Sequence, residues 1–246
     1  MDRKDFTRHI SGAMNASMEA IFNHILEMGG MVEKQIECAI EALQKNDGDL
    51  AKKVVELDKE VNRQEVEIDT HCARILARQQ PTALDLRLIL SAIRMAVDLE
   101  RMGDESVKLA KFVIGMADKG LSCTQVSGLE HLIEISARSL KMLRMSLDGF
   151  ARLSLLHSQE VIMEEDSLDE LYKKVLADLT ERVRQGGPEA TCVLELIFAL
   201  RAAERMSDHA RNIEESLVYL VSGKDIRDMS DEEMQAFLTE AVAKEA

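Results

Sequence analysis

The chain has 246 residues, of which 46% are apolar, 31% charged and only 3% aromatic, and its formal net charge is −14. This acidic balance argues against a nucleic-acid groove and against adhesion to anionic lipid, because both need clustered Lys and Arg. The N-terminal segment lacks the apolar stretch of a secretory signal, and no apolar run approaches the ~20 residues that span a bilayer, so we expect a soluble, cytoplasmic protein without direct membrane insertion.

The first half of the chain is predicted to form three helices. Apolar residues recur every three or four positions over residues 21–43, and the polar stretch 46–49 ends this first helix. A second helix is expected over 50–78, before a break at 79–82 that contains a proline. A third helix is expected over 84–113, where the apolar spacing is again helical.

The pattern stops near residues 120–124 and then begins again. Apolar positions over 129–147 repeat those of the first helix at an offset of 104 residues, and those over 199–217 repeat the third helix at the same offset. Between them a fifth helix is expected over 158–184, followed by a Gly-Gly-Pro break. The chain is therefore predicted to be an internal duplication of a three-helix unit.

The predicted fold is all-α, with two tandem three-helix bundles whose six long antiparallel helices are related by a pseudo-twofold internal repeat. The first bundle is expected over residues 1–120 and the second over 121–223. Residues 224–246 form an acidic C-terminal tail. In this tail Ser230 and Glu233 have the spacing of a capping box, which predicts one last short helix.

One short acidic segment occurs in both halves. Glu-Arg-Met-Gly-Asp begins at Glu100, and Glu-Arg-Met-Ser-Asp begins at Glu204. On a helix, a Glu and an Asp four residues apart lie on one face, and like charges so placed repel each other unless a cation lies near them. The pairs Glu100/Asp104 and Glu204/Asp208 are therefore the first candidates for a metal site.

A solvated ladder of salt bridges is the alternative interpretation of these pairs. Lys108 follows Asp104 by four residues, and Arg211 follows Asp208 by three. Both spacings allow a favourable ion pair on one helix. The spacing alone leaves the metal site and the ladder open.

The second predicted helix of each half has a similar but less regular pair of oxygen-bearing side chains four residues apart. Asp58 and Asn62 are four residues apart in the first half, as are Glu165 and Asp169 in the second. If the second and third helices of each bundle are neighbours, these side chains converge with the duplicated acidic pairs. An all-oxygen donor set suits hard or borderline cations such as Mg, Mn or Fe.

The sequence gives no independent case for catalysis. No histidine has a Glu three residues before it, so the Glu-x-x-His pattern of di-iron bundle enzymes is absent. His209 adjoins Asp208, but neighbouring helical residues point about 100° apart, so a ligand role is not expected. Two further functions stay open: a metal-dependent phosphohydrolase in which the carboxylate clusters activate water, and a metal-free structural scaffold.

Further segments follow in collinear order along almost the whole chain: 9–12, 28–33, 49–52, 65–69 and 78–87, before the two Glu-Arg-x-x-Asp signatures. Together they resemble the PhoU family of bacterial phosphate-uptake regulators. The resemblance implies acidic motifs that gather metal ions, either iron or other divalent cations such as Mn, Mg or Zn. Carried over residue by residue, the implied ligands are Glu100, Asp104, Glu204, Asp208, Glu165, Asp169 and Asp58. Asn62 departs from the motif because it carries an amide.

The resemblance also implies a regulatory, non-enzymatic role. Family members repress the phosphate-starvation response when phosphate is plentiful, by linking the ATPase of a phosphate ABC transporter to a sensor histidine kinase. They are commonly homodimers that act at the inner face of the membrane through protein partners. These properties are expectations from the resemblance and do not follow from helix periodicity.

Overall fold

In the computed structural model, the described residues (6, 12–81, 83–186 and 190–245) form seven α-helices and no strand. The helices are α1 (Gly12–Lys45), α2 (Gly48–Gln79), α3 (Ala83–Asp118), α4 (Leu129–Arg152), α5 (Ser158–Gln185), α6 (Ala190–Ser222) and α7 (Asp231–Glu245). The predicted all-α class, with six long helices in two repeated groups of three, is confirmed.

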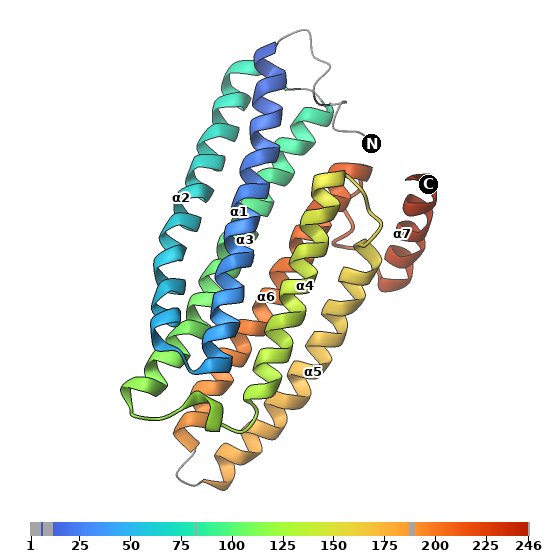
Figure 1. The fold of residues 1–246 in the computed structure, drawn as a ribbon. Helices are drawn as coiled ribbons and strands as arrows, with labels where there is room; N and C mark the ends of the chain where they lie inside the picture. Colours follow the sequence, from blue (N-terminus) through green and yellow to red (C-terminus); the bar gives the residue numbers. More distant parts are fainter. Residues whose placement is uncertain (1–5, 7–11, 82, 187–189, 246) are drawn as a thin grey trace.

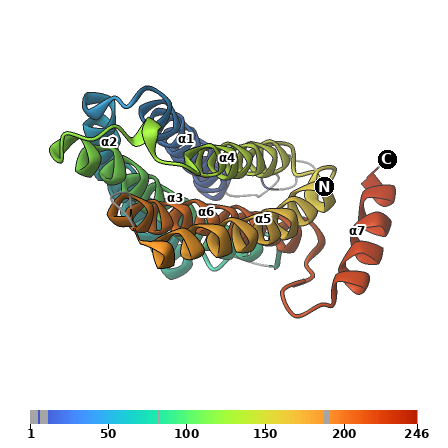
Figure 2. The ribbon, with the colours of Figure 1, turned by 90° about the horizontal axis from the view of Figure 1, so that it is seen from below.

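The six long helices form two bundles that lie side by side (Figure 1). Helices α1, α2 and α3 make the first bundle, and α4, α5 and α6 make the second. The most extensive contact between any two helices joins α3 to α6, and α1 also packs on α4. Helix α7 stands outside both bundles, beyond α5 (Figure 2). The two halves are therefore joined mainly through their third helices.

A single hydrophobic core runs through both halves. The rings of Phe22 in α1 and Phe150 in α4 lie 5.1 Å apart between centroids. Gly29 in α1 packs so closely on α4 that a Cβ atom there would lie 2.7 Å from the Leu147 side chain. Each Leu, Ile or Phe side chain that becomes fully buried stabilises the fold by roughly 1.5–3 kcal/mol. The apolar stripes found in the sequence are the faces that meet in this core.

The ends of two helices follow the chemistry expected from the sequence. Asp47, in the predicted polar break, caps α2 by accepting hydrogen bonds from the backbone of Asp49 (3.0 Å) and Leu50 (2.9 Å). At the start of α7, the Glu233 carboxylate accepts a hydrogen bond from the Ser230 backbone at 3.1 Å, which confirms the predicted capping box. Parts of both predicted breaks, at 82 and 187–189, lie outside the described residues.

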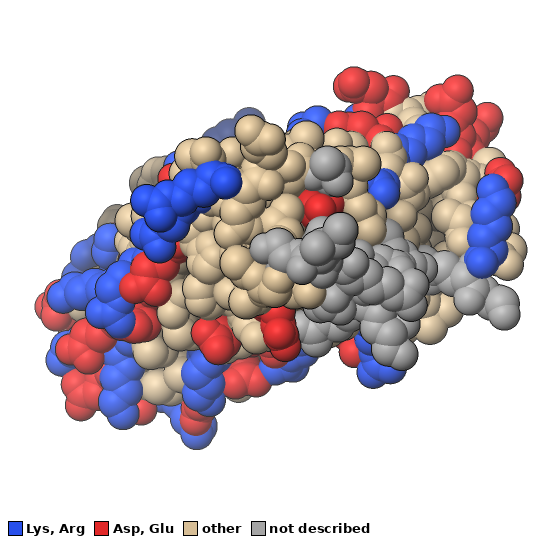
Figure 3. Space-filling view, turned by 90° about the horizontal axis from the view of Figure 1, so that it is seen from above, with Lys and Arg blue, Asp and Glu red and all other residues tan. Residues whose placement is uncertain are grey.

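The charged side chains are mixed in sign on the end of the molecule seen in Figure 3, where Lys and Arg lie beside Asp and Glu along much of the rim. No described helix is both long enough and apolar enough to cross a membrane.

Candidate metal centre

The duplicated acidic segments lie in the middle of the crossing between α3 and α6. These helices run antiparallel, because Ser91 near the start of α3 donates a hydrogen bond to the carbonyl of Ser216 near the end of α6, at 3.1 Å. Closer to the centre, Arg205 Nε lies 2.9 Å from Glu105 Oε1. The first acidic pair therefore lies beside α2, and the second beside α5, at the same level of the molecule.

In the first half, α3 brings its acidic pair against acidic side chains of α2. Burial raises the pKa of Glu100, and the negative charges of Asp104, Glu65 and Asp58 raise it further, while Arg101 lowers it. Three of the predicted residues, Glu100, Asp104 and Asp58, thus lie near enough for their charges to interact. The structure adds Glu65, which the sequence reasoning did not select. We call Glu100, Asp104, Asp58 and Glu65 the first cluster.

A buried amide forms the inner wall of the first cluster. Gln35, which is fully buried in α1, donates through Nε2 to Asp58 Oδ1 at 3.1 Å and to the carbonyl of Gly103 at 3.4 Å. Among the described residues its Oε1 atom is buried without a hydrogen-bond partner. The Gln35 side chain packs tightly on α3 here, because a Cβ at Gly103 would lie 2.9 Å from Gln35 Oε1. A lone glutamine on an apolar stripe gave no signal in the sequence.

The outer side of the first cluster is open to solvent. The Asp104 side chain is 39% exposed, and Asn62 is exposed one turn along α2 from Asp58. Arg101 lies 3.6 Å from Glu100 and 3.7 Å from Asp104, with half of its own side chain exposed. Exposed ion pairs at such distances contribute little, so much of this negative charge remains available.

In the second half, Glu204 is the most buried member of the duplicated pairs. Its side chain is 8% exposed, and its Oε1 atom accepts a hydrogen bond from Arg201 at 2.9 Å. Its Oε2 atom is buried and has no partner among the described residues. Burial, together with the charges of Asp208 and Asp169, raises the pKa of Glu204 to about 7, although Arg201 acts in the opposite direction.

The other predicted ligands of the second half lie around Glu204, and most of them carry a basic partner. Burial raises the pKa of Asp208 more than its basic neighbours lower it. Asp169 pairs with Lys173 at 2.5 Å. Glu165 accepts a hydrogen bond from Arg211, and its pKa is raised by burial. We call Glu204, Asp208, Asp169 and Glu165 the second cluster.

The predicted salt-bridge ladder is wrong in its partners. Lys108 pairs with Glu105, at 2.8 and 2.7 Å from its two carboxylate oxygens, instead of with Asp104. Arg211 pairs with Glu165 across to α5, instead of with Asp208 on its own helix. Glu105, which is only 2% exposed, attracts Lys108 because desolvation strengthens that ion pair.

His209 does not turn toward Asp208, as expected from the angle between neighbouring helical residues. Its Nδ1 atom lies 2.9 Å from Asp98 Oδ1 on α3, and Asn212 also donates to that oxygen at 3.1 Å. Both His209 and Asp98 are largely buried. This polar contact ties the two halves together and lies apart from the carboxylate pairs.

The donor chemistry fits a hard cation, although no group of three or more His, Cys, Asp or Glu side chains in the described part of the chain lies close enough to hold a metal ion. The members of both pairs are carboxylates, and Glu204 has a buried oxygen without a partner. Mg²⁺ usually keeps several waters and needs only one or two protein carboxylates. Glu100 with Asp104, or Glu204 with Asp208, supplies that number.

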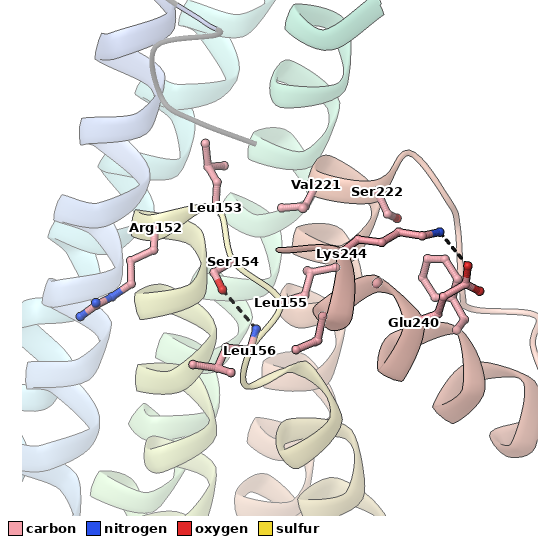
Figure 4. A pocket seen from close by; sticks show the side chains of 12 residues that line it. Arg152, Leu153, Ser154, Leu155, Leu156, Val221, Ser222, Glu240 and Lys244 are labelled. Carbon is pink, nitrogen blue, oxygen red and sulfur yellow. Dashed lines mark hydrogen bonds and ion pairs between the residues drawn. The ribbon is translucent and has the colours of Figure 1, made fainter. Parts of the chain in front are cut away.

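A separate cavity of about 700 Å³ lies at another part of the molecule, between α7, the end of α6 and the connection from α4 to α5. Figure 4 shows Leu153 and Leu155 of this connection facing Val221 of α6, with Glu240 and Lys244 of α7 paired at the rim, 2.7 Å apart. Its lining is mainly apolar and includes none of the predicted metal ligands.

An all-helical chain made of two similar bundles, with a carboxylate pair at matching places in each, defines a class of duplicated helical proteins. The sequence matches the family described as "PhoU domain" twice, over residues 25–113 and 132–217. The chain therefore belongs to the PhoU family.

Known proteins resemble the chain over nearly its whole length. A protein of Pseudomonas putida named phosphate-specific transport system accessory protein PhoU homolog is 40% identical over 236 residues, which is 96% of this chain and 91% of that protein. The crystal structure of PhoU from Pseudomonas aeruginosa is 40% identical, covers 85% of this chain and 99% of its own, and has a TM-score of 0.81. The phosphate transport system regulatory protein PhoU from Streptococcus pneumoniae, 26% identical, covers 86% and 98% with a TM-score of 0.76.

Proposed function

We propose that this chain is a regulatory accessory protein of a phosphate transport system. The observation that carries the proposal is the double match to the PhoU domain, supported by a relative of that name that is 40% identical over 96% of the chain. The duplicated bundle with acidic pairs beside its central crossing is consistent with the same role.

In this proposal the protein acts as an adaptor and not as an enzyme. It represses the phosphate-starvation response when phosphate is plentiful, by coupling the ATPase of a phosphate ABC transporter to a sensor histidine kinase. It works as a homodimer in the cytoplasm, held at the inner membrane by these partners. The long helix faces of a rigid bundle suit binding of other helical proteins.

We also propose that hard divalent cations, Mn²⁺ or Mg²⁺, bind at the carboxylate pairs Glu100/Asp104 and Glu204/Asp208. Asp58, Glu165 and Asp169 lie around these pairs and strengthen the negative field. A bound cation neutralises the mutual repulsion of the carboxylates and so stabilises the flank of each bundle. Zinc is less favoured by a donor set of oxygen atoms alone.

The adaptor role is tested by deleting the gene in its own host and following a reporter of the phosphate-starvation response in phosphate-rich medium. We expect derepression in the deletion strain and repression on complementation with the wild-type gene. In parallel, the purified protein is titrated against the cytoplasmic part of the kinase and against the transporter ATPase. An unchanged reporter together with no binding to either partner would refute the proposal.

The phosphohydrolase alternative is tested with the same purified protein. Phosphomonoester hydrolysis is assayed with Mn²⁺, Mg²⁺ and Fe²⁺, beside the Glu100→Gln/Glu204→Gln double variant. We expect equal background rates for both proteins. Turnover by the wild type alone would make the chain an enzyme.

A further inference from the structure

The two halves can be aligned position by position. Helices α3 and α6 align at an offset of 104 residues, as the acidic segments show. Helices α2 and α5 align at 107, because α1 and α2 are separated by two residues and α4 and α5 by five. This alignment superimposes the buried stripe Val54, Val61, Ile68 and Cys72 of α2 on Val161, Leu168, Val175 and Leu179 of α5. Asp58 then corresponds to Glu165, and Asn62 to Asp169.

Three basic side chains contact the acids of the second cluster, and each replaces a valine of the first half. Arg201, which pairs with Glu204, corresponds to Val97. The other two are Arg211, which pairs with Glu165 and corresponds to Val107, and Lys173, which pairs with Asp169 and corresponds to Val66. The first half therefore has three of the four carboxylates of the site, with Asn62 in place of the fourth, and valines in place of the three basic partners.

The valines leave the first cluster open. Val97 is 42% exposed and Val66 is 59% exposed, so two of the three positions face solvent beside the acids. The basic side chain that does contact this cluster, Arg101, approaches no closer than 3.6 Å. Its counterpart in the second half, Arg205, turns to Glu105 on α3 at 2.9 Å.

The buried amide of Gln35 is a second, independent sign that the first cluster takes a ligand. Its side chain is fully buried, and its Nε2 atom is bonded to Asp58 within the cluster. Its Oε1 atom lies beside Gly103 and lacks a partner among the described residues. The corresponding position in the second half is Ser139, whose hydroxyl donates to backbone carbonyls and adds no oxygen to the second cluster.

We propose that the two halves use different counter-ions: the second cluster is neutralised by its own Arg201, Arg211 and Lys173, whereas the first cluster binds the exchangeable divalent cation. This inference rests on the metal binding proposed above and narrows it from both carboxylate pairs to the pair of the first half. The Glu204 oxygen that Arg201 leaves unpartnered among the described residues is buried and shielded from solvent.

Electron paramagnetic resonance measures the number of bound Mn²⁺ ions, because free Mn²⁺ gives the signal and bound Mn²⁺ loses it. Calorimetry on the same samples measures the affinity. In the full-length protein we expect one class of sites. Glu100→Gln/Asp104→Asn removes that class, whereas Glu204→Gln/Asp208→Asn changes its affinity less than twofold.

Matched exchanges between the halves test the role of the basic residues. Val97→Arg copies the second half into the first, and we expect at least a tenfold loss of Mn²⁺ affinity. Arg201→Val/Lys173→Val copies the first half into the second, and we expect a second class of sites. Val97→Leu is the control for Val97→Arg, since it changes volume without charge. Circular dichroism and thermal melting show whether each variant is folded.

The outcomes separate this inference from the broader proposal. If the wild type binds no Mn²⁺, both fail. If Mn²⁺ binding survives Glu100→Gln/Asp104→Asn and is lost in Glu204→Gln/Asp208→Asn, metal binding stands and the assignment to the first half is overturned. If the two double variants lose equal fractions of the bound Mn²⁺ and Val97→Arg has no effect on binding, the two halves are equivalent. The assignment to the first half then fails, while the broader proposal of metal binding stands.

Discussion

The two halves of this molecule share a backbone plan and differ in how they treat the same carboxylate pair. In the second half Glu204 is buried and meets a guanidinium, and its neighbours Glu165 and Asp169 carry basic partners as well. In the first half Glu100 lies among three further acids, and its nearest base is half exposed. A duplicated motif is thus a poor guide to duplicated chemistry, because the residues one turn away decide what the carboxylates can bind.

The largest expected difference between the halves is in their pH dependence. The pKa of Glu204 in the folded chain is raised to about 7 from 4.5, mainly by burial. A carboxyl with a raised pKa favours the fold while it is protonated, so its destabilising effect begins above pH 4.5 and is complete above pH 7. We expect the free energy of unfolding to fall by roughly 2–3 kcal/mol between pH 5 and pH 8 on this account.

Chemical denaturation at each pH measures this fall. Glu204→Gln removes the titrating group and should flatten the profile, whereas Glu100→Gln should flatten it less, because Glu100 is more exposed. Equal profiles for the wild type and Glu204→Gln would contradict the difference in burial. Saturating Mn²⁺ should stabilise the wild type more at pH 8 than at pH 5, since cations bind the ionised form.

The second prediction removes an internal cation of the second half. Arg211→Val copies Val107 and leaves the buried carboxylate of Glu165 without its guanidinium. Removing one partner of a partly buried ion pair should lower the free energy of unfolding by about 2 kcal/mol, which is less than the loss for a fully buried ion pair. Lys173→Val is the control, because the exposed pair of Lys173 with Asp169 should contribute under ~0.5 kcal/mol. Urea unfolding compares the two, and equal losses would argue against burial as the cause.

The third prediction concerns the close approach of α1 and α3. Gly103→Ser copies Ser207 of the second half and places a Cβ atom 2.9 Å from Gln35 Oε1. We expect a loss of about 1 kcal/mol from the crowding, partly offset by the better helix propensity of serine. Adding Gln35→Ser, which copies Ser139, should restore part of the stability.

A double-mutant cycle on these two positions gives the coupling energy. A favourable coupling of at least ~0.5 kcal/mol is expected for residues in contact. Additive effects of the two substitutions would show that the Gln35 side chain moves aside without cost.

The sequence could predict the helices and the duplication, because amphipathic stripes and polar breaks are local signals. Asp47 and the Ser230–Glu233 capping box lie where the pattern placed them. It could also select the carboxylates, since the repeat marks Glu100 and Glu204. It could not select Gln35, which contacts the cluster only through packing of α1 on α3.

The basic partners were missed for a different reason. Alignment at a single offset of 104 hides the correspondence of Lys173 with Val66, because the longer connection between α4 and α5 shifts that helix to 107. The choice of Glu165 by Arg211, instead of Asp208 on the same helix, depends on the distance between α5 and α6. Periodicity along one helix does not contain that distance.

The smallest effect on stability, and the sharpest test of the first cluster, is expected from Asn62→Asp. Asn62 is exposed and corresponds to Asp169, so the change adds one carboxylate to the first cluster at its outer side. Surface substitutions of this kind usually change stability by less than ~0.5 kcal/mol. A further negative charge near Glu100 and Asp58 should nevertheless raise Mn²⁺ affinity by about threefold to tenfold, since one pair of charges in a partly solvated site contributes roughly 1 kcal/mol. Calorimetry at two salt concentrations measures the gain, which should shrink at high salt.

Asp169→Asn in the second half is the matched control, and because Arg201 and Lys173 already neutralise that cluster, it should leave Mn²⁺ binding unchanged. If Asp169→Asn changed the Mn²⁺ affinity more than Asn62→Asp, the second cluster and not the first would be the main Mn²⁺ site.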